Sequence, residues 1–175
     1  IVDADSGLLS TDFRALEHLA QLLVQVAGRA GRENNKGEVF IQTHFPEHPM
    51  LHTLLSGGYT AFSKELLMQR QAVGLPPYGY LALFRAEDVD EMTPMNFLKE
   101  LKTVLSQYPF KSIMLLGPIE SMMPRRAGKF RAQLLLQSQC RRELQLLLTE
   151  IMSHEWLKRQ RKKIHWSLDV DPVDA

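Results

Sequence analysis

The chain has 175 residues, of which 45% are hydrophobic, so it is long enough to bury a core in one domain or in two small ones. No apolar run approaches the roughly 20 residues that a membrane-spanning helix needs, and the N-terminus lacks the pattern of a secretory signal. The single cysteine excludes an internal disulfide and a four-cysteine zinc site, and it is typical of a reducing cytoplasm.

The formal net charge of +1 is unevenly distributed along the chain. Residues 1–108 carry 9 lysines and arginines against 13 acidic residues, whereas residues 109–175 carry 12 against 7. The second part therefore has a net charge of +5 and the first a net charge of −4. A basic half beside an acidic half is typical of proteins that bind nucleic acid, although solvated cations are also the default on any surface.

The first 43 residues predict a strand, a helix and a second strand. Residues 1–5 read as part of a buried strand, as if cut from a longer chain. Ser10 or Thr11 can cap the helix that follows, and apolar residues then recur at helical spacing as far as Ala27. Residues 39–43 are rich in β-branched and aromatic side chains, which favour a strand. Strand, helix and strand in this order predict a parallel α/β unit.

The end of the predicted helix carries the octet Gln-Val-Ala-Gly-Arg-Ala-Gly-Arg, which begins at Gln25. Arg29 and Arg32 lie three residues apart, so on a helix they point the same way. Gly28 and Gly31 precede them and leave open backbone that a ligand could approach closely. Guanidinium groups match phosphate oxygens two at a time, so this set is suited to stabilising charge on a transferring γ-phosphoryl group. The alternative is a helix end with a solvated pair of arginines.

Three histidines follow at intervals of four residues, namely His44, His48 and His52. On an uninterrupted helix they would offer a metal-binding face. Pro46 and Pro49 cannot occupy a helix interior, and Pro49 is well placed to open a helix. We therefore favour loop and capping roles for these histidines over metal binding.

A second helix is predicted over residues 59–72 and is stopped by Gly74. The stiff segment Leu-Pro-Pro at residues 75–77 follows, and we place the domain boundary there. The remaining chain predicts alternating strands (S) and helices (H): S 80–86, H 94–107, S 112–116, S 130–137, H 141–152 and S 164–170. This βαββαβ order is that of a ferredoxin-like α+β sandwich.

Four cations surround one aromatic residue in the hairpin before residues 130–137: Arg125, Arg126, Lys129 and Arg131 beside Phe130. Cations with an aromatic ring suit phosphate contact combined with base stacking. The alternative is a solvated hairpin tip with the ring turned into the core. We favour DNA contact, because binding to branched DNA needs phosphate contacts rather than sequence readout.

Two further surfaces carry charge. Residues 158–163 form a denser basic run without an aromatic residue, for which a solvated loop and a phosphate track are equally open. Arg141 and Gln145 lie four apart near a helix start, where the helix dipole and free amides favour carboxylates, although an ordinary exposed helix face is an equal alternative. Cys140, just ahead of them, reads as a packed or capping thiol.

The octet is similar to motif VI of superfamily 2 helicases, and its flanks resemble the primosomal protein N′ (PriA) family. The similar segments span essentially the whole chain: residues 3–5, 12–17, 37–49, 75–77, 125–136 and 168–172. Members of that family are bacterial, ATP-driven, 3′-to-5′ DNA helicases that restart stalled replication forks, and the chain resembles their C-terminal portion. The resemblance implies that residues 1–76 are the C-terminal part of helicase lobe 2, which has a RecA-like fold. It implies that residues 77–175 are a C-terminal domain similar to a small-subunit ribosomal protein.

The resemblance also assigns roles to the octet. Arg32 would be the arginine finger on the γ-phosphate, Arg29 its partner and Gln25 the positioning group, with Gly28 and Gly31 beside the nucleotide. The chain has no Gly-x-x-x-x-Gly-Lys-Ser/Thr loop and no acidic pair placed to hold magnesium. ATP and Mg²⁺ would therefore bind in the parent helicase, where another lobe completes the site, and we expect this segment alone to be inactive.

The implied partners are branched DNA, other primosome proteins and the acidic C-terminal tail of single-stranded DNA-binding protein (SSB), which Arg141 and Gln145 would contact. No membrane is implied, and the location would be the cytoplasm, at the nucleoid. The family's zinc cysteines would lie in an insertion outside this chain, so no metal residues are assigned here. The alternative to a motor is a non-catalytic adaptor that binds nucleic acid and protein.

Overall fold

The computed structural model describes residues 2–10, 12–30 and 38–173. The described chain forms two compact units, which divide between Val73 and Gly74. No helix in the described ranges is both long enough and apolar enough to cross a bilayer. Gly31 and Arg32 of the octet lie outside the described residues.

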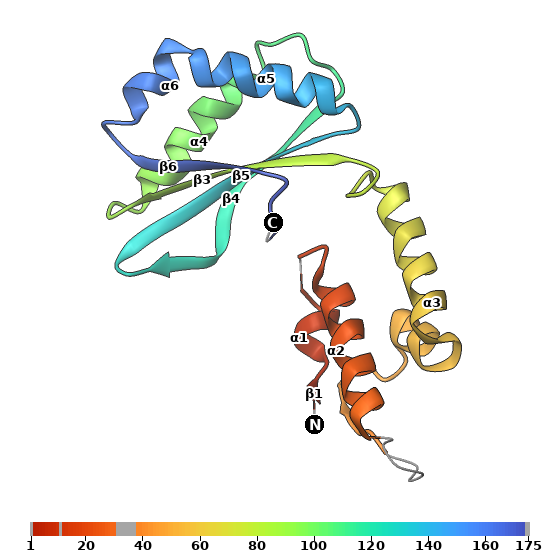
Figure 1. Cartoon of the computed structure of the whole chain (residues 1–175). Helices are drawn as coiled ribbons and strands as arrows, with labels where there is room; N and C mark the ends of the chain where they lie inside the picture. Colours follow the sequence, from red (N-terminus) through yellow and green to blue (C-terminus); the bar gives the residue numbers. More distant parts are fainter. Residues whose placement is uncertain (1, 11, 31–37, 174–175) are drawn as a thin grey trace. The chain divides into compact units, whose positions relative to one another are not determined.

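The first unit contains a short parallel strand pair and three helices (Figure 1). Strand β1 (Val2–Asp3) pairs in parallel with β2 (Ile41–Gln42), and helices α1 (Asp5–Leu8) and α2 (Ala15–Ala30) lie between them in sequence. The parallel strand–helix–strand unit is therefore confirmed. The strands are shorter than predicted, and the short helix α1 lies where no helix is predicted. Helix α3 (Pro49–Ala72) follows β2.

The core of the first unit forms between α2 and α3. Three residues of α2 that recur at helical spacing are buried there, namely Leu19, Ala20 and Leu23. Helix α3 buries Met50, Leu51, Leu54, Phe62 and Leu66 in the same cluster. Just before α2, the Asp12 carboxylate accepts the Arg14 N–H at 2.9 Å, and Ser10 Oγ accepts the Asp12 N–H at 3.1 Å. The other predicted cap, Thr11, lies outside the described residues.

Helix α3 begins at Pro49, as the sequence predicts, and His48 is its N-cap. The Nδ1 atom of His48 accepts the N–H of Met50 at 3.3 Å. Gly58 interrupts the helix with φ 69° and ψ −175°. The part of α3 after this interruption corresponds to the separate helix that the sequence predicts from residue 59. Gly74 follows the helix with φ 67°, a left-handed conformation typical of the position after a helix end.

The second unit is a four-stranded antiparallel sheet with helices on one face (Figure 1). Along the chain it consists of β3 (Tyr80–Asp88), α4 (Met92–Leu105), β4 (Ile113–Arg126), β5 (Lys129–Ser138), α5 (Arg141–Ser153), α6 (Glu155–Gln160) and β6 (His165–Val170). The strand order in the sheet is β4-β5-β3-β6. The predicted βαββαβ order is thus found, with α6 added, and the unit is an α+β domain.

Alternation along the strands places one row of side chains against the helices. On β3 this row is Ala82, Phe84 and Ala86, and on β5 it is Ala132, Leu134 and Leu136. The helices contribute apolar residues at helical spacing, namely Phe97, Leu98, Leu101 and Leu105 of α4 and Leu144, Leu147, Leu148 and Ile151 of α5. Trp166 of β6 completes the cluster, with its ring centroid 6.0 Å from that of Phe84.

Two features of the second unit differ from the prediction. Strand β4 continues to Arg126, although the sequence predicts that Gly117-Pro118 closes it. It is an edge strand, where a proline removes no necessary hydrogen bond, and its pairing with β5 shifts register on both sides of Glu120. The basic run at residues 158–163 begins on helix α6, not in a loop.

Candidate functional site

The C-terminal end of α2 presents two polar side chains of the octet. Gln25 and Arg29 are exposed and lie one helical turn apart, so they share a face, while Leu19 and Leu23 anchor the helix on the core side. Arg29 forms no ion pair with any residue in the described ranges. Its guanidinium is therefore available to an anionic ligand.

Gly28 lies on an open part of this helix end. A Cβ atom added at Gly28 would meet no heavy atom within 4 Å. The backbone there is accessible, as the predicted close approach of a ligand requires. A glycine, an amide and a guanidinium on one exposed helix end are suited to binding phosphate oxygens.

The hairpin between β4 and β5 turns through Ala127 and Gly128, with φ angles of 50° and 80°. Positive φ at both turn residues is the type I′ combination that matches the twist of two antiparallel strands. Arg126 pairs with Lys129 and Arg125 with Phe130 across the ladder. The hairpin thus holds the predicted basic residues at its tip.

Arg125 lies over the ring of Phe130, with the guanidinium carbon 5.2 Å from the ring centroid. The ring is half-buried and one of its faces is covered, so it supports Arg125 rather than offering a free platform for a base. Arg125 and Arg126 are exposed, and neither forms an ion pair within the described part of the chain. These two arginines are the exposed cations of the hairpin.

Glu87 of β3 pairs with Lys129 and faces two further basic side chains near the hairpin. Its Oε1 atom lies 2.8 Å from Lys129 Nζ and 3.3 Å from His165 Nδ1, and the strand register places Arg131 directly opposite it. The hydrogen bond from Lys129 is the main reason that the pKa of Glu87 lies below its usual value, and the charges of Lys129, His165 and Arg131 add to the effect. In the folded protein, Lys129 is therefore engaged in an ion pair with Glu87.

Replacing Lys129 with methionine is expected to weaken the acid sensitivity of the fold. Because the folded-state pKa of Glu87 lies below its unfolded value, the folded protein binds fewer protons, so this stabilisation is present above the unfolded pKa and is lost as pH falls through the folded one. Urea unfolding at pH 7 and pH 3 should show a smaller stability difference for Lys129→Met than for the natural chain. An unchanged difference would contradict the assignment.

Arg141 and Gln145 are exposed on the first turns of α5, as the sequence predicts. Arg141 forms no ion pair with a described residue, and the N-cap Cys140 gives no side-chain hydrogen bond to the helix. The backbone N–H of Cys140 donates to Ser138 Oγ at 3.0 Å. Arg141 at a helix start remains a suitable place for a carboxylate.

Each of the three histidines has a different interaction partner. His44 Nδ1 contacts Asp5 Oδ2 at 2.5 Å, His48 caps α3, and His52 Nε2 contacts Glu47 Oε2 at 3.1 Å. The predicted loop and capping roles are confirmed for His44 and His48, whereas His52 lies inside the first turns of α3. Hydrogen bonds from Thr43 and His44 hold the pKa of the Asp5 carboxyl below its usual value.

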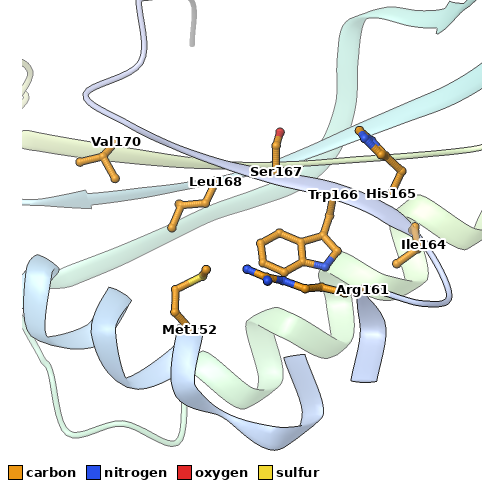
Figure 2. A pocket seen from close by; sticks show the side chains of 8 residues that line it. All are labelled: Met152, Arg161, Ile164, His165, Trp166, Ser167, Leu168 and Val170. Carbon is orange, nitrogen blue, oxygen red and sulfur yellow. The ribbon is translucent and has the colours of Figure 1, made fainter. Parts of the chain in front are cut away.

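One groove on the second unit is not predicted from the sequence. It runs along β6 beneath α5 and α6, and Figure 2 shows Arg161 beside the indole of Trp166, with Met152 and Leu168 nearby. Lys158 is paired with Glu155 at 2.9 Å, but Arg161 lies over Trp166, 5.6 Å from its ring centroid. The spacing of an arginine and a tryptophan five residues apart carries no strand or helix signature that would have revealed this contact.

Comparison with known proteins identifies relatives along the whole chain. A family model described as the primosomal protein N C-terminal domain matches residues 71–173. The chain is similar to the replication restart protein PriA of Haemophilus influenzae, with 44% identity over 99% of the chain and 24% of the relative. The PriA proteins of Synechocystis and Bacillus subtilis are 32% and 30% identical, over 99% and 98% of the chain and 20% and 21% of the relatives. The chain therefore spans about a quarter or less of the length of these relatives.

Proposed function

The chain belongs to the primosomal protein N C-terminal domain family, and from this premise we propose that it acts in the restart of DNA replication by contacting branched DNA. The observation that carries the proposal is the pair of exposed, unpaired arginines at the tip of the β4–β5 hairpin, Arg125 and Arg126. Guanidinium groups on a narrow projecting hairpin can contact phosphates at a fork without reading sequence. The +5 charge of residues 109–175 supports the same role.

The first unit contributes to a motor in this proposal. We infer that it is the end of a RecA-like helicase lobe in a longer ATP-dependent, 3′-to-5′ DNA helicase. Gln25 and Arg29 on their exposed helix face, together with Arg32, would face the γ-phosphate of ATP bound by another lobe. Bound ATP and Mg²⁺ would supply the transferable phosphoryl group and its charge neutralisation, while these side chains would orient the phosphate. The accessible backbone at Gly28 fits this task.

The α5 start would provide the contact to the SSB tail. Arg141 would bind a carboxylate of that acidic tail, and Gln145, one turn later, would donate to it. With this contact and other primosome proteins the chain would work at the nucleoid in the cytoplasm. We also propose that its βαββαβ unit is similar to a ferredoxin-like ribosomal protein.

The DNA contact is tested by removing both arginines of the hairpin tip. In the 175-residue chain, Arg125→Ala with Arg126→Ala should weaken binding to a forked duplex and lower the slope of log affinity against log salt by about 2, because each lost phosphate contact lowers it by about 1. Fluorescence anisotropy of a labelled fork over a salt series measures both quantities.

A matched control removes the same charge elsewhere. Lys64 and Lys99 are exposed and outside the hairpin, so Lys64→Ala with Lys99→Ala makes an equal change in net charge. This control should keep most of the affinity and of the salt slope. If both double variants bind equally well, the hairpin is not the DNA contact and general charge alone drives binding.

A further inference from the structure

Strand β6 has a free backbone edge. It pairs only with β3 among the described strands and forms one end of the sheet order β4-β5-β3-β6. The N–H of Asp171 donates to Leu81 O at 2.9 Å, which fixes that pair as hydrogen-bonded. Because hydrogen-bonded and non-hydrogen-bonded pairs alternate in an antiparallel ladder, the N–H and C=O groups of Trp166, Leu168 and Val170 point away from β3.

The same three residues face a groove of about 500 Å³ along this edge. Figure 2 shows Trp166 and Leu168 on the helix side of β6, close to Met152 of α5, while Ser167 points to the opposite side. The indole Nε1 of Trp166 is buried and has no acceptor among the described residues. An unsatisfied donor, unpaired backbone groups and apolar side chains therefore meet along one strand edge.

A cation, Arg161, lines the groove at the end where β6 begins. Arg161, Lys162 and Lys163 are consecutive and exposed, and none forms an ion pair with a described residue. The carboxylate of β6 itself, Asp169, pairs with Arg85 at 2.9 Å on the other face of the sheet. The rim therefore complements an anionic group.

From these features we propose that β6 binds an extended acidic peptide by strand addition. The peptide would run antiparallel to β6, as every paired strand of this sheet does, so its C-terminal end would lie beside the cationic rim. Alternate apolar side chains would enter the groove over Leu168 and Met152, and carboxylates at its C-terminal end would bind Arg161. This site is separate from the proposed SSB contact at Arg141.

A peptide fits this groove better than single-stranded nucleic acid does. Arg161 covers one face of Trp166, and Phe97 is stacked at 6.3 Å with an interplanar angle of 27°. A base could therefore stack on the face beneath Arg161 only by displacing the guanidinium. Unpaired strand N–H and C=O groups instead match the backbone of another strand, which supplies affinity through main-chain hydrogen bonds.

The test uses the 175-residue chain and the labelled synthetic peptide Val-Thr-Val-Thr-Val-Glu-Glu-Glu. In the proposed register the valines enter the groove, and their N–H groups bond to β6. N-methylation of the valines should abolish binding in fluorescence anisotropy, whereas N-methylation of the threonines should leave it within about twofold. Amide exchange at Trp166, Leu168 and Val170 should slow when the unmodified peptide binds.

Variants of the protein separate this site from its alternatives. Arg161→Glu should weaken peptide binding by about tenfold or more, because it reverses the charge at the rim. Lys64→Glu makes the same change in charge at an exposed position of the other unit and should have little effect on this peptide. Loss of binding in Arg141→Glu but not in Arg161→Glu would place the peptide at the proposed SSB contact and overturn the proposal. Equal binding of both N-methylated peptides would overturn the proposal. The proposal would also be overturned if oligothymidylate displaced the peptide and the Arg161→Glu variant no longer bound oligothymidylate.

Discussion

Phe84→Ala is expected to destabilise the sheet unit by about 3–5 kcal/mol, the range for removal of a buried phenylalanine side chain. Phe84 is 0% exposed and lies in the middle of β3, between β5 and β6. Its ring packs 6.0 Å from that of Trp166, beside the buried faces of α4 and α5. Loss of the ring leaves a cavity that the strands on both sides prevent from closing. Since domains are stable by only about 5–15 kcal/mol, this change should bring the unit close to unfolding.

Tryptophan fluorescence during urea unfolding measures this effect. Both tryptophans of the chain, Trp156 and Trp166, lie in the sheet unit, so their signal follows that unit alone. The matched control is Phe40→Ala, because Phe40 is 74% exposed and outside the sheet unit. The control should leave the midpoint unchanged. Equal midpoints for the two variants would contradict the placement of Phe84 at the centre of the core.

Local periodicity predicts most of the sheet unit. The spacing of Phe97, Leu98, Leu101 and Leu105 identifies α4 within two residues of each end, because these side chains define one buried face. Strand β5 alternates between inward and outward side chains and is equally recognisable. The parallel pairing of β1 and β2 also follows from element order, although their length depends on neighbours that sequence patterns do not specify.

The parts that could not be predicted depend on long-range pairing. A Gly-Pro pair ordinarily ends a strand, and only the sheet order shows that β4 is an edge on which Pro118 is tolerated. Helix α6 is short and mainly polar, and it forms because Leu157 is buried against the core while His154 caps its start. Neither reason is visible in the hydrophobic pattern of residues 155–160.

In the candidate sites, too, the local chemistry can be predicted from the sequence but the long-range contacts cannot. The sequence identifies the chemistry of the hairpin, namely arginines and a lysine around a phenylalanine, but not which cations are engaged. Glu87 lies 42 residues before Lys129 and holds it by an ion pair, whereas Arg125 and Arg126 are exposed and form no ion pair with a described residue. Cross-strand register decides this, so a linear basic motif overstates the number of free charges.

In the longer ATP-dependent helicase that we propose, replacing Arg32 with alanine is expected to lower the kcat of DNA-stimulated ATP hydrolysis by about a thousandfold or more, the effect of losing an arginine finger. Under the proposed function, the resemblance of the octet to motif VI would give Arg32 this role. Arg29 should show a loss in the same direction, because it lies on the exposed face that ends α2 and has no competing ion pair among the described residues. Steady-state hydrolysis at saturating ATP and DNA measures both variants.

The decisive comparison is between hydrolysis and DNA affinity in the same variants. A finger acts on charge that develops at the γ-phosphate, so its removal should reduce kcat while the affinity for forked DNA stays within about twofold. The exposed Lys64 provides the control, since Lys64→Ala removes one positive charge from the same unit without touching the octet. If Arg32→Ala retains its hydrolysis rate but loses affinity for DNA, the octet is a DNA contact and the chain acts as an adaptor rather than as part of a motor.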